Sequence, residues 1–353
     1  MGGLSNFILI SLLFSIPSLI AYAIGKPSVR VLTWWGYIDL NDPKTMEIEK
    51  KCNARISVDE FYSNAEFLER ISGKDKTLPY DILIFSDTVI KSSQTKFIEL
   101  LKTKIVQSSR DYTKDVKKFY QNRNYNPSTV IFQISLTGFL VNKDKVTISS
   151  KSKLKDFFGK SPDSIFVLLD DHVEISTLLK KWECDESIDG CSKNSNQIFP
   201  SEEKLKNLIG QSKLVISSDL ANISKHPNFA VAYTWSGDAL QKLNSQENLE
   251  FILHPSLSHT SMDLLTLAGQ SPEASCVANF FSKKDYLDSV SMRTKYFSPF
   301  GVVSTQDKNF ENLQNEFFAR FSSLGRIYRV TQEESLEIDK KWQLFKIVFG
   351  SKI

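Results

Sequence analysis

From residue 30 onward, short apolar runs alternate with segments in which apolar residues recur at helical spacing. The apolar runs predict strands, and the segments with helical spacing predict helices. In the first part of the chain we expect strands at residues 31–33, 55–61 and 81–85 and helices near residues 43–51 and 65–71. Later we expect strands at residues 164–169, 214–217 and 229–234 and a helix at residues 175–182. This alternation is typical of an α/β fold.

Two α/β portions are separated by an asparagine-rich segment, residues 120–127, and a long apolar run, residues 130–141. We interpret this stretch as the first crossing between two lobes, because the chain is longer than one hydrophobic core usually serves. Lobe 1 is predicted to contain residues 24–133 plus about 264–305, and lobe 2 residues 134–263 plus about 306–353. The fold class is therefore α/β, with a mixed sheet flanked by helices in each lobe and a ligand cleft between them.

The N-terminal segment has the pattern of a secretory signal. Residues 1–23 contain no charged side chain, include the apolar run 7–19, and end in the small-x-small pattern Ala21-Tyr22-Ala23. We predict a cleaved signal peptide over residues 1–23. An uncleaved N-terminal anchor is the alternative, because the segment lacks the usual Lys or Arg at its start. No later segment is apolar and long enough to span a bilayer.

Charge and cysteine content exclude some classes of protein. The chain has 44 Lys and Arg against 41 Asp and Glu. This excess of positive charge is too small and too dispersed to indicate a nucleic-acid-binding surface. Cys184 and Cys191 flank a short polar loop and could form a disulfide outside the cytoplasm. Cys52 and Cys276 lie far apart in the sequence, and we expect them to be buried thiols. No cysteine or histidine stands at zinc-ligand spacing, so no metal site is expected.

An aromatic cluster follows the first predicted strand. Trp34, Trp35 and Tyr37 surround Gly36, which interrupts the strand and starts a loop. In open α/β sheets, loops at the carboxyl ends of strands are where ligands bind. Any one of these rings alone could be a core residue. As a set, they predict one wall of a binding site.

Acidic residues follow two other predicted strands. Asp171 and Glu174 start the predicted helix at 175–182, where they could either cap its backbone amides or bind a cation. Trp235 and Asp238 flank Gly237 after the strand at 229–234, and an ammonium group gains from an aromatic face and a carboxylate together. Asp263 is a further isolated acid before an apolar run.

A catalytic role finds less support in the sequence. Paired carboxylates could act as a glycosidase pair, and a set of acids and histidines could be proposed as metal ligands: Asp170, Asp171, His172, Glu174, His254 and His259. Neither spacing is specific, and there is no nucleophile elbow or phosphate-binding glycine loop. We predict that the protein is not an enzyme and has no cofactor.

In order and spacing, these motifs resemble the spermidine/putrescine-binding proteins of bacterial polyamine ABC transporters, in the type II periplasmic binding protein superfamily. The matching blocks are Trp34-Trp35-Gly36-Tyr37-Ile38-Asp39, Tyr62-Ser63-Asn64-Ala65-Glu66, residues 80–86, Asp171 to Glu174, Trp235-Ser236-Gly237-Asp238, Asp263, Tyr296-Phe297-Ser298-Pro299 and Trp342-Gln343. The resemblance implies a monomeric periplasmic protein that closes around a polyamine and docks on permease subunits in the inner membrane.

The resemblance also implies roles for individual residues. The methylene chain of the ligand would lie against the rings of Trp34, Tyr37, Trp235 and Tyr296, and Trp35 would belong to the same aromatic wall. The ammonium groups would bind Asp171, Glu174, Asp238 and Asp263. Ser86 and Gln343 would add polar contacts. Two departures bear on ligand identity. The hinge segment Pro-Tyr-x-Trp-Gly of the family is replaced by residues 131–135, and Ser261 stands where spermidine binders often have an aromatic residue. The choice between putrescine and spermidine stays open, as does a relative of the same fold with another ligand or a sensory or antigen role.

Overall fold

The computed structural model describes residues 26–71, 78–90, 111–122, 129–158, 162–186, 200–327 and 332–350. The predicted signal peptide lies outside these residues. Across the described segments, the helices are all too short or too polar to traverse a lipid bilayer.

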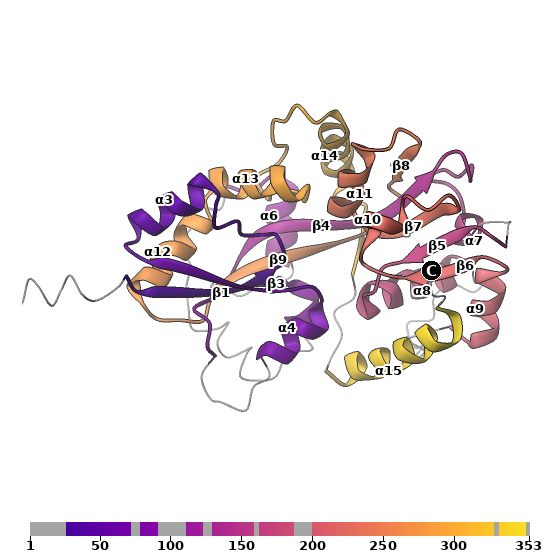
Figure 1. The fold of residues 1–353 in the computed structure, drawn as a ribbon, viewed down its shortest axis with the longest axis horizontal. Coiled ribbons are helices and arrows are strands. Elements are labelled where there is room, and N and C mark those ends of the chain that lie inside the picture. Colours follow the sequence, from indigo (N-terminus) through magenta and orange to yellow (C-terminus); the bar gives the residue numbers. More distant parts are fainter. Residues whose placement is uncertain are drawn as a thin grey trace, which may run out of the picture.

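A mixed sheet runs through the whole molecule, with the strand order β2-β1-β3-β9-β4-β7-β5-β6 (Figure 1). Two short strands join it, because β8 pairs with β4 and β10 pairs with β9. The strands are β1 (Ser28–Trp34), β2 (Arg55–Phe61), β3 (Ile82–Ser86), β4 (Thr129–Asn142), β5 (Ile165–Leu168), β6 (Lys213–Ile216), β7 (Phe229–Trp235), β8 (Leu249–Ile252), β9 (His259–Leu267) and β10 (Gly325–Arg326).

Two long antiparallel strands, β4 and β9, connect the two halves of this sheet (Figure 1). On one side, β1, β2 and β3 are parallel, and β9 runs antiparallel to β3. On the other side, β5, β6 and β7 are parallel, and the end of β4 pairs antiparallel with β7. We call the part around β1–β3 the first lobe and the part around β5–β8 the second lobe. The sequence positions at which the lobes divide stay a prediction.

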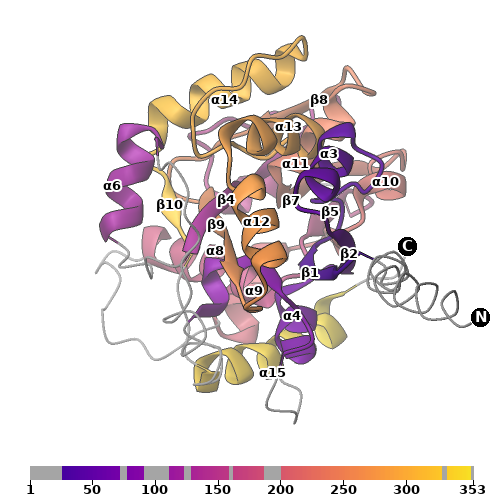
Figure 2. The same ribbon diagram turned by 90° about the vertical axis from the view of Figure 1, so that its left-hand side faces the viewer.

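Helices cover both faces of the sheet (Figure 2). They are α3 (Pro43–Lys51), α4 (Asn64–Ile71), α6 (Lys114–Asn122), α7 (Leu154–Phe157), α8 (His172–Glu186), α9 (Glu202–Ile209), α10 (Leu220–Ile223), α11 (Ser236–Leu243), α12 (Pro272–Phe281), α13 (Lys284–Thr294), α14 (Lys308–Arg320) and α15 (Gln332–Phe349). A single turn of 3-10 helix, Asp87–Ile90, follows β3. In the first lobe, α3, α12 and α13 pack with β1 and β3 in one apolar cluster. In the second lobe, α8, α9 and α15 contribute to another.

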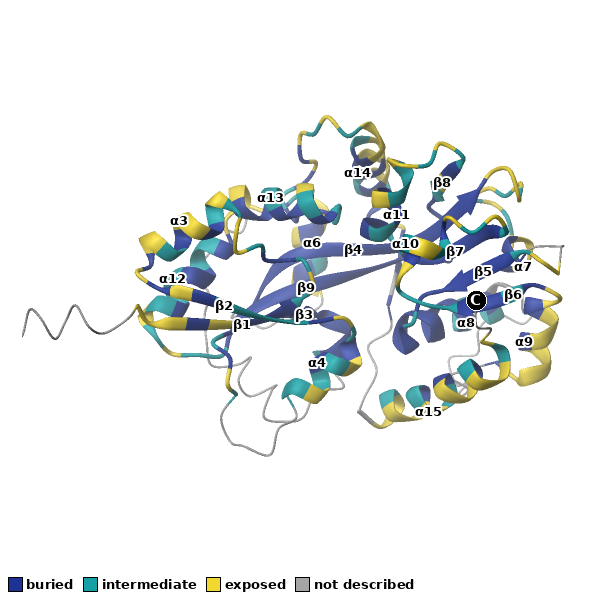
Figure 3. Cartoon of the chain, in the orientation of Figure 1, coloured by how far each residue is buried: buried dark blue, intermediate teal, exposed yellow. Residues whose placement is uncertain are grey.

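Local sequence explains where several elements begin. Asp42 accepts a hydrogen bond from the Lys44 amide and Pro43 occupies the first turn, so α3 begins as predicted. Ser271 and Pro272 start α12 in the same way. The residues of β3 are all buried, as expected for a strand covered on both faces. Figure 3 shows the central strands buried between helices whose outer faces are exposed, whereas β1 and β2, at one edge of the sheet, are partly exposed.

One cysteine prediction is wrong. Cys52 and Cys276 form a disulfide although 224 residues separate them. Cys52 ends α3, Cys276 lies in α12, and both helices pack on the same face of the first lobe. Cys184 is also disulfide-bonded, but Cys191 lies outside the described residues, so the predicted pairing of these two stays a prediction.

Removing the Cys52–Cys276 disulfide should lower stability substantially. The bond closes a loop of more than two hundred residues, and such cross-links stabilise by roughly 2–5 kcal/mol, mainly by restricting the unfolded chain. We expect the double variant Cys52→Ser/Cys276→Ser to unfold at a lower denaturant concentration, measured by circular dichroism in urea. Cys276→Ser alone, with the Cys52 thiol alkylated, also lacks the bond, so its midpoint should fall to a similar extent. An unchanged midpoint would contradict the prediction.

Candidate functional site

A cavity of about 680 Å³ lies between the two lobes. In the first lobe its walls come from the ends of β1, β2 and β3, the loops that follow them, and the end of α13. In the second lobe they come from α8, α10 and α11, which follow β5, β6 and β7, and the middle of β9 lies in between. Nine of the eleven side chains predicted for the site line it: Trp34, Trp35, Tyr37, Ser86, Glu174, Trp235, Asp238, Asp263 and Tyr296. Strand ends far apart in sequence therefore meet at one place, as the α/β pattern implied.

Aromatic rings form two layers in the cavity. In the inner layer, Trp34 of the first lobe meets Trp235 of the second edge-on, with ring centroids 6.1 Å apart, and Tyr37 lies 5.9 Å from Tyr296. At the rim, Trp35 stacks on Tyr62 at 6.0 Å, and both rings are about 60% exposed. A flat or extended apolar group could therefore lie against rings along the whole depth of the cavity.

Asp263 is an almost fully buried acid of the cavity. It lies on β9 opposite Ser86 of β3, and its Oδ2 accepts a hydrogen bond of 2.5 Å from the Tyr37 hydroxyl. Burial raises the pKa of Asp263 to about 7, although the hydrogen bond from Tyr37 opposes this change. No cation in the described structure lies near enough to neutralise this carboxylate through an ion pair of its own.

Two further carboxylates with raised pKa values line the cavity, and the exposed Asp219 lines it as well. Burial raises the pKa of Asp238, in the first turn of α11, to about 6. Burial, followed by the neighbouring Asp171, raises the pKa of Glu174 well above its usual range. The Trp235 indole donates to Glu174 Oε1 at 3.5 Å, whereas Glu174 Oε2 is buried with no partner among the described residues. A bound cation would restore the ionised form of all three acids.

These acids should make the ligand-free protein less stable as the pH rises. The folded-state pKa values of Asp238 and Asp263 exceed the usual 3.8, so the stabilisation from their protons is complete below about pH 4. It is lost as the pH rises through about 6 and 7. His259 has the opposite effect on stability. Burial lowers its pKa, so this histidine makes the folded protein less stable as the pH falls into the acid range.

The effect of the two carboxylates is therefore measured as the difference in melting temperature between two proteins. Melting temperatures of the wild type and of Asp238→Asn/Asp263→Asn should be compared by calorimetry from pH 5 to pH 8. The double variant retains His259, so the difference isolates the two carboxylates. We expect the variant to become relatively more stable with rising pH, and a difference that does not change with pH would contradict this.

Asp171 lies behind the cavity wall. Its Oδ1 accepts the Val173 and Glu174 amides at 3.0 Å each, which makes Asp171 the N-cap of α8. Its Oδ2 accepts from Asn64 Nδ2 of α4 at 3.1 Å. Of the two interpretations of this acid, the capping role is the one its contacts display, and it is absent from the cavity lining.

Gln343 is not brought together with the other predicted residues. It lies on the exposed face of α15, where its Nε2 donates to Asp339 at 3.1 Å. The preceding Trp342 is buried instead, and its indole donates to Asp170 at 2.9 Å. One residue along a helix turns the side chain by about 100°, so burying Trp342 directs Gln343 to solvent.

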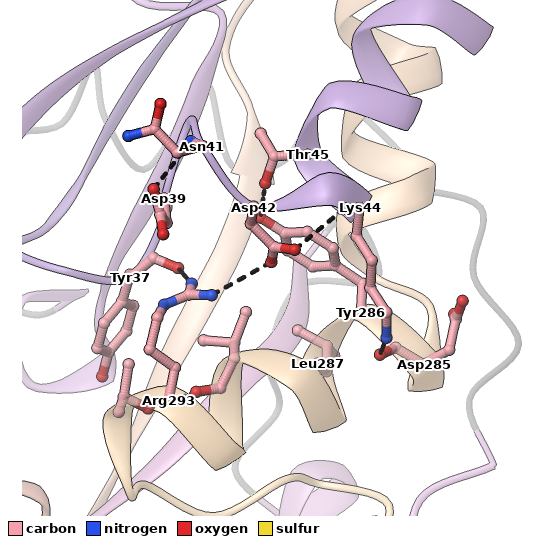
Figure 4. Close-up of polar contacts among 12 residues, drawn as sticks. Tyr37, Asp39, Asn41, Asp42, Lys44, Thr45, Asp285, Tyr286, Leu287 and Arg293 are labelled. Carbon is pink, nitrogen blue, oxygen red and sulfur yellow. Dashed lines mark hydrogen bonds and ion pairs between the residues drawn. The ribbon is translucent and has the colours of Figure 1, made fainter.

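Several lining residues were not predicted: Asn64, Ser135, Ser261 and Arg293. Arg293 of α13 holds the loop that carries Tyr37 (Figure 4). Its Nη2 donates to the Tyr37 carbonyl at 2.7 Å, and its Nη1 lies 3.3 Å from the Asp42 carboxylate. Nothing local in the sequence connects residues 37–42 with residue 293, so only the packing of α13 beside α3 places this guanidinium.

The metal interpretation finds no support in the part of the chain described. No group of three or more His, Cys, Asp or Glu side chains there is arranged to hold an ion. His259 Nδ1 is 2.8 Å from the Tyr233 hydroxyl, and His254 Nε2 is 2.9 Å from the Ser152 carbonyl. These histidines have structural hydrogen bonds away from the cavity.

Comparison with known proteins places the fold. No family model matches the sequence, and no curated protein is significantly similar to it. Among solved structures, the substrate-binding protein of a spermidine/putrescine ABC transporter from Streptococcus pneumoniae is similar at a TM-score of 0.69 and 18% identity, over 91% of this chain and 99% of that one. A protein described as a putative spermidine/putrescine ABC transporter from Listeria monocytogenes is similar at a TM-score of 0.69 and 17% identity, over 91% of this chain and 99% of that one.

The likeness extends to proteins described with other ligands. A periplasmic thiamin-binding protein is similar at a TM-score of 0.61 and 11% identity, over 93% of this chain and 97% of that one. At such identities the likeness establishes the arrangement of the chain and leaves the ligand open. The chain has the two-lobed fold of the substrate-binding proteins of ABC transporters.

Proposed function

We propose that the protein captures a polyamine, putrescine or spermidine, in the cavity between its lobes and delivers it to the permease subunits of an ABC importer. The protein would act outside the cytoplasm, in the periplasm, after removal of the signal peptide predicted at residues 1–23. It would work as a monomer, with no catalytic step and no cofactor. The disulfide between Cys52 and Cys276 is consistent with an oxidising compartment.

The observation that carries the proposal is the combination of buried acids and rings in one cavity. Glu174, Asp238 and Asp263 all have raised pKa values because each is buried. A polyamine has ammonium groups on an apolar methylene chain, so it can meet carboxylates at its charges and aromatic faces between them. Trp34, Tyr37, Trp235 and Tyr296 would line that chain.

A second candidate is a binding protein of the same fold with a different cationic ligand or a sensory or antigen role. The similar fold of the thiamin-binding protein, and the exposed stacked rings of Trp35 and Tyr62, are the observations in its favour. An aromatic cation could stack on exposed rings of this kind. A simple diamine has no flat surface with which to use them.

Isothermal titration of the refolded, ligand-free protein tests the proposal. Putrescine, spermidine and spermine are the ligands, thiamin represents the second candidate, and 1,4-butanediol is the uncharged control with the same methylene chain as putrescine. We expect one-to-one binding of an amine, no binding of the diol, and proton release near pH 6–7 as Asp238 and Asp263 ionise. Folded protein that ignores all three amines would refute the polyamine proposal. Conversion of the amine during incubation would refute the absence of catalysis.

A further inference from the structure

A hydrogen bond between side chains joins the two lobes directly beside the cavity. Asn64, the first residue of α4, belongs to the first lobe, and Asp171, which precedes α8, belongs to the second. Asn64 Nδ2 donates to Asp171 Oδ2 at 3.1 Å. Both side chains are almost fully buried, at 5% and 4% exposure, so solvent competes little for this hydrogen bond.

The side chain of Asn64 is not needed for the helix it begins. Ser63 caps α4 by accepting from the Glu66 amide at 3.2 Å, and Glu66 accepts from the Tyr62 amide at 2.9 Å. Ser63 is thus the N-cap of α4, and Glu66 satisfies the amide of the residue before the cap, in a variation on the capping box. The amide of Asn64 is therefore free to bridge to the other lobe.

The orientation of the Asn64 amide follows from its partner. Nδ2 of Asn64 donates to the Asp171 side chain, so Oδ1 of the same amide faces elsewhere. Asn64 lines the cavity, and its Oδ1 is buried with no partner among the described residues. Glu174 lines the same cavity from the second lobe, and its Oε2 is equally without a described partner. Two buried oxygens without a described partner, one from each lobe, therefore belong to side chains that line one cavity.

We propose that Asn64 couples ligand binding to lobe closure. Its Nδ2 fastens the first lobe to Asp171 of the second, and its Oδ1, together with Glu174 Oε2, accepts hydrogen bonds from an ammonium group of the ligand. Asp171 then acts as a positioning residue that holds Asn64 and caps α8 without touching the ligand. The ligand-contacting part of this inference rests on the proposed function, whereas the link between the lobes does not.

Three variants separate this arrangement from a direct role for Asp171. Asn64→Ala removes the link and the acceptor, so amine affinity should fall about 10-fold or more. Asp171→Asn keeps the helix cap, because asparagine caps as well as aspartate. The new Nδ2, however, requires Asn64 to turn its oxygen toward residue 171 and its NH₂ toward the ammonium, so affinity should again fall about 10-fold or more.

The third variant restores the pattern of donors and acceptors. In Asn64→Asp/Asp171→Asn, the new carboxylate accepts from Asn at position 171 with one oxygen and faces the ligand with the other. Titration should return affinity to within about 3-fold of the wild type or better. If Asn64→Ala binds within 2-fold of the wild type, or if the double variant is as weak as Asp171→Asn alone, the proposal is overturned.

A readout that needs no ligand tests the link itself. Asn64→Asp alone places two carboxylates together, so X-ray scattering of the ligand-free variant should give a larger radius of gyration than the wild type. The double variant should return to the wild-type value. Equal radii for all three proteins would overturn the link. If no amine binds the wild type, the proposed function and the ammonium contact fail, and the scattering still decides whether Asn64 and Asp171 join the lobes.

Discussion

Replacing Asp263 with asparagine should weaken amine binding by a factor of at least about 30 and stabilise the ligand-free protein above pH 7. The carboxylate is buried, and none of the described residues forms an ion pair with it. Removing one partner of a buried, hydrogen-bonded charge pair costs roughly 2–5 kcal/mol of binding free energy. The Tyr37 hydroxyl can still donate to the oxygen of the new amide, so the local hydrogen bond is retained.

The gain in stability follows from the same burial. The pKa of Asp263 rises from 3.8 to about 7, so ionising this acid in the folded protein costs on the order of 4 kcal/mol at high pH. The asparagine variant avoids that cost. A binding protein that is less stable when empty and gains stability from its cargo is the expected result of such a site.

Titration calorimetry at pH 8 measures the loss of affinity, and thermal unfolding of the ligand-free proteins measures the gain in stability. Asp59→Asn is the matched control, because Asp59 is an exposed acid paired with Arg30 outside the cavity. We expect the control to bind and unfold like the wild type. If Asp263→Asn binds as tightly as the control, the acid does not contact the cargo.

Replacing Gly237 with alanine should hold the lobes apart. Gly237 lies in the first turn of α11 in the second lobe, and a Cβ atom there would come within 2.6 Å of the Thr294 carbonyl oxygen and 2.8 Å of the Tyr296 ring. The Thr294 carbonyl ends α13 and is backbone, so it cannot turn away as a flexible side chain could. The overpacking should cost roughly 1–3 kcal/mol, mainly in the closed arrangement.

We expect Gly237→Ala to bind its amine at least about 10-fold more weakly, with a faster dissociation rate and a larger radius of gyration in scattering. Far-ultraviolet circular dichroism should be unchanged, because alanine is a good helix former. Ser236→Ala, at the neighbouring position of the same turn, is the control for changes to the start of α11. Wild-type affinity and radius in Gly237→Ala would show that the lobes tolerate the extra methyl group.

The amino-acid sequence by itself determined the local structure. Apolar runs such as the one that forms β3 are buried whichever helix covers them, and the Asp42-Pro43 pair starts α3 through contacts within four residues. The sequence also identified nine of the residues that line the cavity, because rings and acids that follow predicted strands share the sheet edge where those strands end. That inference needs only the alternation of strands and helices.

Only the tertiary structure decided which distant residues meet. Cys52 reaches Cys276 because α3 and α12 pack side by side. Arg293 reaches the Tyr37 loop because α13 packs in the same apolar cluster as these two helices. The two carboxylate oxygens of Asp171 illustrate the difference between local and long-range contacts. Its cap of α8 is local and was among the interpretations of the sequence, whereas its hydrogen bond to Asn64 depends on two lobes facing each other. Local contacts are fixed by residues a few positions apart, but contacts between elements depend on how whole helices and strands pack, and no short segment of sequence contains that information.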